Sequence, residues 1–286
     1  MPELPEVEIL ARRLGERTVG RRIEAVQVAS ISALKTYDPP VTALAGRAIN
    51  SVGRRGKYVC IDTGGLWLVF NLARSGWVRW REQLATSEAR PGRGPLALRV
   101  RLEDGGGFEL TEMATDKRLA VFVARSPLDI EAVATLGPEP LDPAFTRERL
   151  GELLAAESGD LKHVLSRQSV IAGVGNAYSD EALHAARLSP FKPAAKLSEA
   201  ELTALHGALV GALTEAIARS ENLELDQLKD TKRSGMRVHG RTGQACPVCG
   251  DTVREVAYAT RSLQYCPTCQ TNGRLLADRR LSRLLK

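Results

Sequence analysis

The sequence lacks the features that mark membrane, secreted and repetitive proteins. Among its 286 residues, no apolar run approaches the roughly 18 residues that a membrane-spanning helix needs. The first residues, MPELPEVEIL, are acidic where a secretory leader is basic, so we expect no signal peptide. No internal repeat or low-complexity tract is present. With 43% hydrophobic and 26% charged residues, the chain is predicted to be globular, and its length favours two domains.

Cysteine is also scarce, and its spacing argues against a disulfide framework. Four of the five cysteines form two Cys-X-X-Cys pairs with sixteen residues between them. Four thiolates at this spacing can build a closed tetrahedral zinc site, and the intervening residues can form a β-hairpin. A redox-active motif would need only one pair. We therefore predict no organic cofactor and one structural Zn²⁺, held by Cys246, Cys249, Cys266 and Cys269.

The net charge of +6 is spread unevenly along the chain. Residues 226–286 contain 12 Lys or Arg and 5 Asp or Glu, whereas the other 225 residues contain 28 and 29. A basic segment built around a metal site is typical of proteins that bind nucleic acid. The alternative is a solvated basic tail.

The first half of the chain is predicted to be rich in β-structure. An amphipathic helix with Val7, Leu10 and Leu14 on its apolar face opens the sequence. Short apolar runs separated by glycine-rich turns follow, and they predict a sandwich or barrel. These runs are Ile23–Val28, Tyr58–Ile61, Leu66–Leu72, Leu96–Leu102 and Leu119–Val123. The proline-rich stretch Leu136–Leu141 predicts a domain boundary.

The second half is predicted to be helical. Helical periodicity covers Phe145–Ala156, Leu161–Gln168, Asn176–Ala186 and Glu199–Ser220. Ser198 and Glu201 form a capping box before the longest helix. Glycines in the turn before Asn176 permit a close backbone approach, and Asn176 is predicted to cap the helix that follows. The N-terminal amides of that helix can receive a phosphate, as in helix–turn–helix proteins.

The N-terminus carries a second chemical signal. Removal of Met1 would expose the secondary amine of Pro2, which can attack an aldehyde-level carbon and form an iminium. Glu3 follows directly and can move a proton at the same centre. The alternative is the plain start of a capped helix. A basic turn, Gly53–Tyr58, offers either solvated charge or a phosphate contact.

Five motifs together resemble the formamidopyrimidine-DNA glycosylase/endonuclease VIII family. They are PELPEVE, GRRGKY, LGPEPL, QSVIAGVGNAYSDEAL and CPVCG…YCPTCQ, and they follow one another in the family's order. The resemblance implies a bilobal α+β fold. A catalytic β-sandwich with an N-terminal helix would span residues 1–135, a helix–two-turn–helix domain 136–240, and a zinc-finger hairpin 241–286.

The resemblance also implies a function. It indicates a bifunctional DNA glycosylase and abasic-site lyase of base-excision repair. Such an enzyme excises damaged, chiefly oxidised, bases from double-stranded DNA and nicks the strand by β- or β,δ-elimination. We expect a monomer in the bacterial cytoplasm, associated with the nucleoid. The alternatives are a damaged-DNA-binding protein with weak or no turnover, and an RNA-binding zinc-ribbon protein, which would not explain PELPEVE.

Matching positions receive roles from this resemblance. Pro2 corresponds to the nucleophile that forms a Schiff base with C1′ of the damaged nucleotide, and Glu3 to the acid that helps to open the sugar. Glu6 corresponds to the acidic neighbour of Glu3, and Lys57 to a lysine associated with β-elimination and phosphate contact.

Three further positions match DNA contacts of the family. Asn176 and Arg261 correspond to residues that bind the same phosphates, and Arg261 is also implicated in δ-elimination. Lys162 matches a lysine near the DNA backbone.

The sequence departs from the family where the family fills the hole left by an everted base. The usual HLGMSG is replaced by residues 71–76, NLARSG, and the usual DPRRFG by residues 116–121, DKRLAV. A flipped base leaves a void that some side chain must fill. We expect Arg74 and Arg118 to contact DNA there, with Leu119 as another candidate. The preferred lesion stays open.

Overall fold

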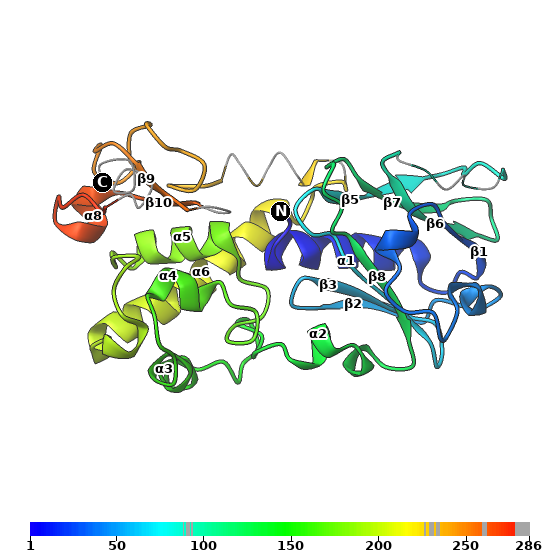
Figure 1. Ribbon diagram of the computed structural model, residues 1–286, viewed down its shortest axis with the longest axis horizontal. Helices are drawn as coiled ribbons and strands as arrows, with labels where there is room; N and C mark the ends of the chain where they lie inside the picture. The colour runs from blue at the N-terminus through cyan, green and yellow to red at the C-terminus, as the bar shows by residue number, and fades with distance from the viewer. Residues whose placement is uncertain are drawn as a thin grey trace. The chain divides into compact units, whose positions relative to one another are not determined.

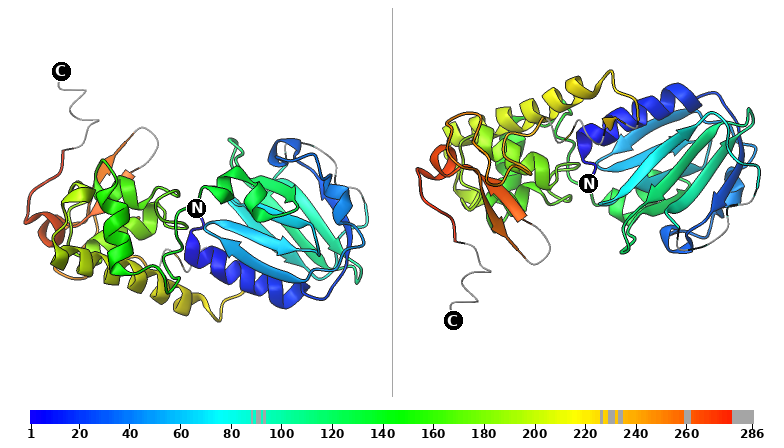
Figure 2. Two further views of the ribbon diagram at one scale, coloured as in Figure 1. Left: turned by 90° about the horizontal axis from the view of Figure 1, so that it is seen from below. Right: turned by 90° about the horizontal axis from the view of Figure 1, so that it is seen from above.

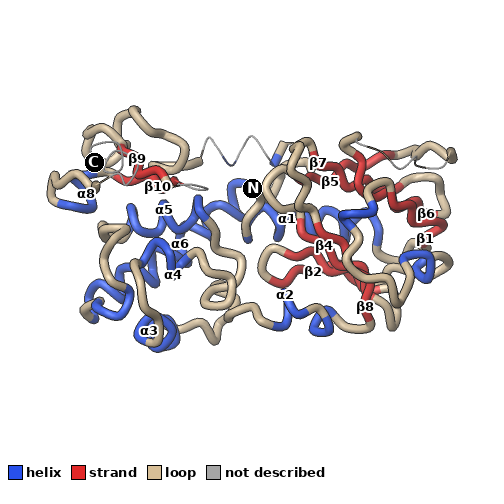
Figure 3. Tube along the Cα trace, in the orientation of Figure 1, coloured by secondary structure: helices blue, strands red, loops and turns tan. Residues whose placement is uncertain are grey.

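The structure is a computed structural model that describes residues 1–87, 89, 92, 94–225, 227–228, 232, 235–258 and 262–277. The chain divides into an N-terminal unit, Met1–Leu136 with Ser220–Lys229, and a C-terminal unit, Gly137–Arg219 with Asp230–Lys286. Most strands lie in the N-terminal unit and the longest helix in the C-terminal unit (Figure 3). Among the described residues, no helix combines the length and apolarity that crossing a membrane requires.

The N-terminal unit is a β-sandwich, as predicted (Figure 1). Its strands are β1 (Ile23–Val28), β2 (Ser51–Arg55), β3 (Tyr58–Asp62), β4 (Trp67–Asn71), β5 (Gly76–Arg81), β6 (Leu96–Leu102), β7 (Gly107–Glu112) and β8 (Ala120–Ala124). They form two four-stranded sheets with the orders β1-β6-β7-β5 and β2-β3-β4-β8. Phe70 of β4 and Phe108 of β7 are fully buried with ring centroids 6.3 Å apart, so the two sheets share one core.

The predicted N-terminal helix is α1 (Leu4–Thr18), which packs against β2 and β3 (Figure 2). Its apolar positions Val7, Leu10 and Leu14 are at most 1% exposed, which confirms the predicted buried face. The other helices of this unit whose bounds lie within the described residues are short: η1 (Ile31–Ala33), η2 (Val41–Leu44), η3 (Pro127–Asp129) and α2 (Glu131–Ala134).

Residues 220–229, which the sequence analysis places in the middle domain, group with the N-terminal unit. The Arg13 guanidinium of α1 donates to the Leu223 carbonyl at 3.2 Å. The Trp77 indole N–H of β5 donates to the Leu225 carbonyl at 3.0 Å. These hydrogen bonds give backbone carbonyls partners that lie far away in the chain, so the neighbouring sequence does not indicate them.

In the part of the chain that the structure describes, the C-terminal unit contains helices and a hairpin. Its elements are α3 (Arg147–Ala155), α4 (Leu161–Leu165), α5 (Asn176–Ala185), η4 (Ala194–Lys196), α6 (Glu199–Ser220), β9 (Arg254–Ala257), β10 (Ser262–Tyr265) and α8 (Pro267–Thr271). The capping box before α6 is confirmed, because Ser198 N–H donates to the Glu201 carboxylate at 2.9 Å and Glu201 N–H donates to Ser198 Oγ at 3.3 Å. Strands β9 and β10 pair in antiparallel fashion, as predicted for the cysteine hairpin.

The segment between α4 and α5 is a tight turn, and α4 ends three residues earlier than predicted. The Gln168 side chain donates to the Val174 carbonyl at 2.5 Å and accepts the Gly173 N–H at 3.1 Å, so its amide closes a turn where the periodicity predicts helix. The linker docks here, because Gly137 N–H donates to the Gln168 carbonyl at 2.9 Å. A Cβ on Gly137 would lie 2.5 Å from the Val170 carbonyl, so only glycine permits this approach.

Candidate functional site

Pro2, Glu3 and Glu6 form a buried N-terminal group at the start of α1. Pro2 is buried, and Glu3 and Glu6 are 2% and 4% exposed. One Glu6 carboxylate oxygen accepts the Glu3 N–H at 2.8 Å. This is the capping-box geometry that satisfies an unpaired donor at a helix start. Glu6 therefore fixes the backbone immediately after Pro2, whatever further role its charge has.

The turn that contains Lys57 joins β2 to β3, and this hairpin contacts both α1 and β4. Gly56 adopts a left-handed φ of 53°, which a turn this tight favours in glycine. Arg54 Nε lies 2.7 Å from the Glu8 carboxylate of α1, and the Arg54 side chain is only 10% exposed. Asn71 at the end of β4 donates to the Lys57 carbonyl at 3.2 Å. The Lys57 backbone is thus held by β4, and Arg54 of the preceding strand links the same hairpin to α1.

Arg74 and Arg118 lie on two different loops. Both loops contact the buried carboxylate of Glu112. Glu112 is 2% exposed, and its oxygens accept the backbone N–H groups of Arg118 at 2.9 Å and Leu119 at 3.0 Å. The Ser75 hydroxyl donates to the same carboxylate at 3.4 Å. Both arginines are exposed at the surface. Glu112 therefore holds together the two segments that depart from the family motifs.

The expectation for Leu119 is wrong. Its side chain is 2% exposed, so it belongs to the core and presents no apolar surface to a vacated stack. An exposed apolar side chain near these loops, Met113 with 68% of its surface accessible, was not singled out from the sequence. The register places Gly76 opposite Glu112, so Met113 is the first residue of its loop beyond the paired strands. The sequence does not distinguish a buried methionine from an exposed one. The signal that could have identified Met113 is its position directly after the end of β7.

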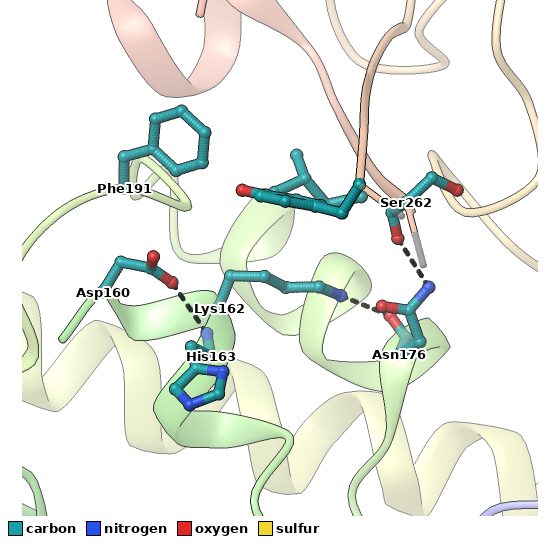
Figure 4. A pocket seen from close by; sticks show the side chains of 8 residues that line it. Asp160, Lys162, His163, Asn176, Phe191 and Ser262 are labelled. Carbon is teal, nitrogen blue, oxygen red and sulfur yellow. Dashed lines mark hydrogen bonds between the residues drawn. The ribbon is translucent and has the colours of Figure 1, made fainter. Parts of the chain in front are cut away.

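A pocket of about 470 Å³ in the C-terminal unit includes two of the predicted DNA contacts (Figure 4). Its lining residues are Asp160, Lys162, His163, Asn176, Phe191, Tyr258, Ser262 and Leu263. The pocket therefore draws on α4, α5 and the zinc-finger hairpin. Arg261, the third predicted phosphate contact, lies outside the described residues, and its neighbour Ser262 lines the pocket.

Asn176 is the first residue of α5 and not its cap. The N-cap residue is Gly175, so the predicted capping role is wrong. The Asn176 side chain extends instead to β10 and donates its amide N–H to the Ser262 carbonyl at 2.7 Å (Figure 4). This contact ties the start of α5 to the backbone next to Arg261.

Lys162 is buried, with 6% of its surface exposed. Its ammonium donates to the Asn176 carbonyl at 2.6 Å and to Ser179 Oγ at 2.8 Å, and it lies 2.6 Å from Asp180 Oδ1. The side chain therefore joins α4 to the first turns of α5 through a buried ion pair. Its contact with a DNA backbone stays a prediction.

The four predicted zinc ligands come together. The sulfur atoms of Cys246, Cys249, Cys266 and Cys269 all lie within 4.8 Å of one another. Burial raises the pKa of the Cys266 thiol to about 11, so a neighbouring cation is needed to stabilise its thiolate at neutral pH. Four converging sulfurs fit a tetrahedral zinc ion, as predicted.

Three family models match the chain in order. They are the formamidopyrimidine-DNA glycosylase N-terminal domain over residues 1–119, the formamidopyrimidine-DNA glycosylase H2TH domain over 136–225, and a zinc finger found in FPG and IleRS over 243–272. These models match the β-sandwich, the helical segment and the four-cysteine hairpin described above.

Relatives and solved structures agree with these models. An uncharacterised formamidopyrimidine-DNA glycosylase-like protein of Mycobacterium tuberculosis is 58% identical over 53% of this chain and 94% of its own length. The formamidopyrimidine-DNA glycosylase of Symbiobacterium thermophilum is 36% identical over 98% of this chain and 93% of its own. The Lactococcus lactis enzyme, solved while non-covalently bound to DNA with an abasic site, superposes with a TM-score of 0.80 at 26% identity, covering 94% and 99% of the two chains. The chain belongs to the formamidopyrimidine-DNA glycosylase family.

Proposed function

We propose that the protein is a base-excision-repair DNA glycosylase that is also an abasic-site lyase. Its substrate is double-stranded DNA that contains damaged, chiefly oxidised, bases or abasic sites. The observation that carries this proposal is the buried N-terminal group, in which Glu3 follows Pro2 directly and the Glu6 carboxylate accepts the Glu3 N–H. The complex of the Lactococcus lactis relative with abasic-site DNA supports the choice of substrate.

The reaction begins at the Pro2 nitrogen once Met1 has been removed. An α-amino group titrates close to neutral pH, so a useful fraction is unprotonated and nucleophilic. Its lone pair forms a bond to C1′, and the electrons of the glycosidic bond leave with the base. The Pro2 nitrogen loses its proton to solvent, and the departing base takes up a proton from solvent. Glu3 protonates the ring oxygen as the sugar opens, which leaves an iminium between Pro2 and C1′.

Strand cleavage follows from the iminium. As an electron sink it acidifies C2′, and loss of a C2′ proton expels the 3′ phosphate as the C3′–O bond breaks. A second elimination at the 5′ side gives the δ step. Lys57 and Arg261 offset the phosphate charge that develops on each leaving group.

Residues of both units serve DNA binding in this proposal. In the C-terminal unit, Asn176, Arg261 and Lys162 contact the phosphates of the DNA, and two of them, Asn176 and Lys162, line the same pocket. Arg74 and Arg118 act where the base is extruded, and the exposed thioether of Met113 adds an apolar surface there. The four cysteines hold one zinc ion, and four thiolates leave no open position for chemistry. The enzyme acts as a monomer in the bacterial cytoplasm.

Borohydride trapping on a duplex with one abasic site tests the proposal. We expect a covalent adduct with the wild-type protein and a weaker one with Pro2→Gly, which keeps a primary amine. The matched control carries an N-terminal tag that holds the Pro2 nitrogen in a peptide bond, and it should give no adduct while binding the same DNA. Tight binding without any adduct would favour a damaged-DNA-binding protein without turnover, and binding to RNA alone would favour the zinc-ribbon alternative.

A further inference from the structure

Helix α5 carries the zinc module, which we define as the four-cysteine cluster with β9, β10 and α8. The Glu181 carboxylate is 6% exposed and accepts the backbone N–H groups of residues 237–239 at 2.8–2.9 Å. Those residues lead into the module. Beyond the end of α5, Gln270 of α8 donates its side-chain N–H to the Leu188 carbonyl at 2.9 Å. The module is therefore anchored at several points along this helix, starting with Asn176.

His184 adds a contact to the cysteine cluster itself. It follows Glu181 by three positions, so both residues lie on one face of α5. The imidazole is 2% exposed, and its Nε2 lies 3.3 Å from Cys246 Sγ, which is hydrogen-bond distance for sulfur. The group of potential ligand atoms within 4.8 Å of one another consists of the four sulfurs, so His184 borders the cluster without joining it.

The proton of His184 is placed by elimination. Its Nδ1 is buried and has no hydrogen-bond partner among the described residues. An imidazolium would leave a buried Nδ1–H donor unpaired, and so would the neutral tautomer protonated at Nδ1. The neutral tautomer protonated at Nε2 directs its only N–H toward the sulfur.

We propose that His184 is a positioning residue for the zinc ion, donating its Nε2–H to the Cys246 thiolate and thereby tying the metal to the helix that begins with Asn176. A donor of this kind orients the ligand and stabilises negative charge on its sulfur, without binding the metal. The proposal rests on the predicted zinc and not on lyase chemistry, so the two can fail separately.

Zinc release from the full-length, zinc-loaded protein into excess chelator tests this role. His184→Phe keeps a planar ring and loses the donor, and His184→Gln can place an amide N–H near the same position. We expect release from His184→Phe to be about tenfold faster than wild type and release from His184→Gln to stay within about threefold. Release from His184→Phe at the wild-type rate would overturn the proposal.

A matched control and a second measurement keep this test independent of folding. His206 contacts the Phe145 carbonyl at 2.8 Å in the same unit, away from the cysteines, so His206→Phe should release zinc at the wild-type rate. If circular dichroism shows that His184→Phe does not fold, long-range ¹H–¹⁵N NMR of the zinc-loaded wild type decides. We expect a protonated Nε2 and an unprotonated Nδ1 for His184, and a proton on Nδ1 would refute the proposed hydrogen bond.

Discussion

The two units hold their candidate residues by different means. In the N-terminal unit, buried carboxylates accept backbone N–H groups. Glu6 accepts the N–H of Glu3 at the start of α1, and Glu112 accepts the N–H groups of Arg118 and Leu119 in a loop. In the C-terminal unit, side chains of α5 contact the zinc module or the segment that leads to it. These side chains are Asn176, Glu181 and His184. The N-terminal group should therefore be formed without metal, whereas the predicted phosphate contacts of Asn176 and Arg261 should depend on it.

Loss of zinc should show the largest difference between the two units, because it should impair DNA binding and leave the β-sandwich folded. Structural zinc contributes about 10–16 kcal/mol of binding free energy in zinc-finger peptides, and it is coupled to folding. We expect Cys249→Ser to lose zinc and to weaken DNA binding about a hundredfold or more, while the β-sandwich keeps its circular dichroism signal. Metal analysis and fluorescence anisotropy measure the two losses. A metal-free variant with normal affinity for damaged DNA would contradict the comparison.

The ion pair of Lys162 with Asp180 should matter next, because the two side chains are 7% and 0% exposed. Lys162→Met removes the ammonium from a buried carboxylate that keeps its contact with His239 Nδ1 at 2.7 Å, and removing one partner of a buried pair costs about 3–5 kcal/mol. Lys192→Met is the matched control, since Lys192 pairs with Glu201 at 2.7 Å where both are about 30% exposed, and it should cost less than about 1 kcal/mol. Urea unfolding of the C-terminal unit measures both, and equal losses would show that burial does not set the strength of these pairs.

Replacement of Arg74 in the N-terminal unit should affect base excision and lyase activity differently. If it stabilises the DNA after a base is extruded, Arg74→Ala should slow excision of a paired lesion about tenfold and change lyase activity on a preformed abasic site much less. A guanidinium can stack on and hydrogen-bond an orphaned base, and no base has to be extruded from an abasic site. The two rates are measured on matched duplexes. Similar losses on both would assign Arg74 to phosphate binding.

Arg261 should give the smallest and least selective effect. A single cationic phosphate contact changes the slope of log affinity against log salt by about one unit. We expect Arg261→Ala to lower the slope by this amount and to weaken binding to every lesion to a similar extent. Titrations at several salt concentrations with three different lesions measure this, and a lesion-dependent loss would indicate base reading instead.

Patterns within single elements were predictable from the sequence, and contacts between distant elements were not. The apolar spacing of α1, the strand periodicities and the cysteine pairs depend on neighbours a few residues away, and the structure agrees with them. Lys162 is different, because its charge is neutralised by Asp180, eighteen residues further on. Leu119 is buried, and its backbone N–H donates to Glu112 at the end of β7, a contact that the local sequence does not indicate.

Asn176 and residues 220–229 show the same limit. A helix-start asparagine next to glycine predicts a cap, yet the side chain of Asn176 binds a carbonyl 86 residues away. Leu223 and Leu225 come directly after a helix of the C-terminal unit, but their carbonyls accept hydrogen bonds from Arg13 and Trp77, which lie far earlier in the chain. Local sequence carries no signal for either pairing.

The central claim is that the Pro2 nitrogen forms the covalent intermediate, and peptide mapping of the borohydride-reduced adduct tests it most directly. Tandem mass spectrometry of the DNA-linked peptide should find the sugar remnant on the nitrogen of an N-terminal peptide that begins PELPEVE, with Met1 absent. An adduct on the Nζ of Lys57, or a fully active protein that retains Met1, would contradict the account.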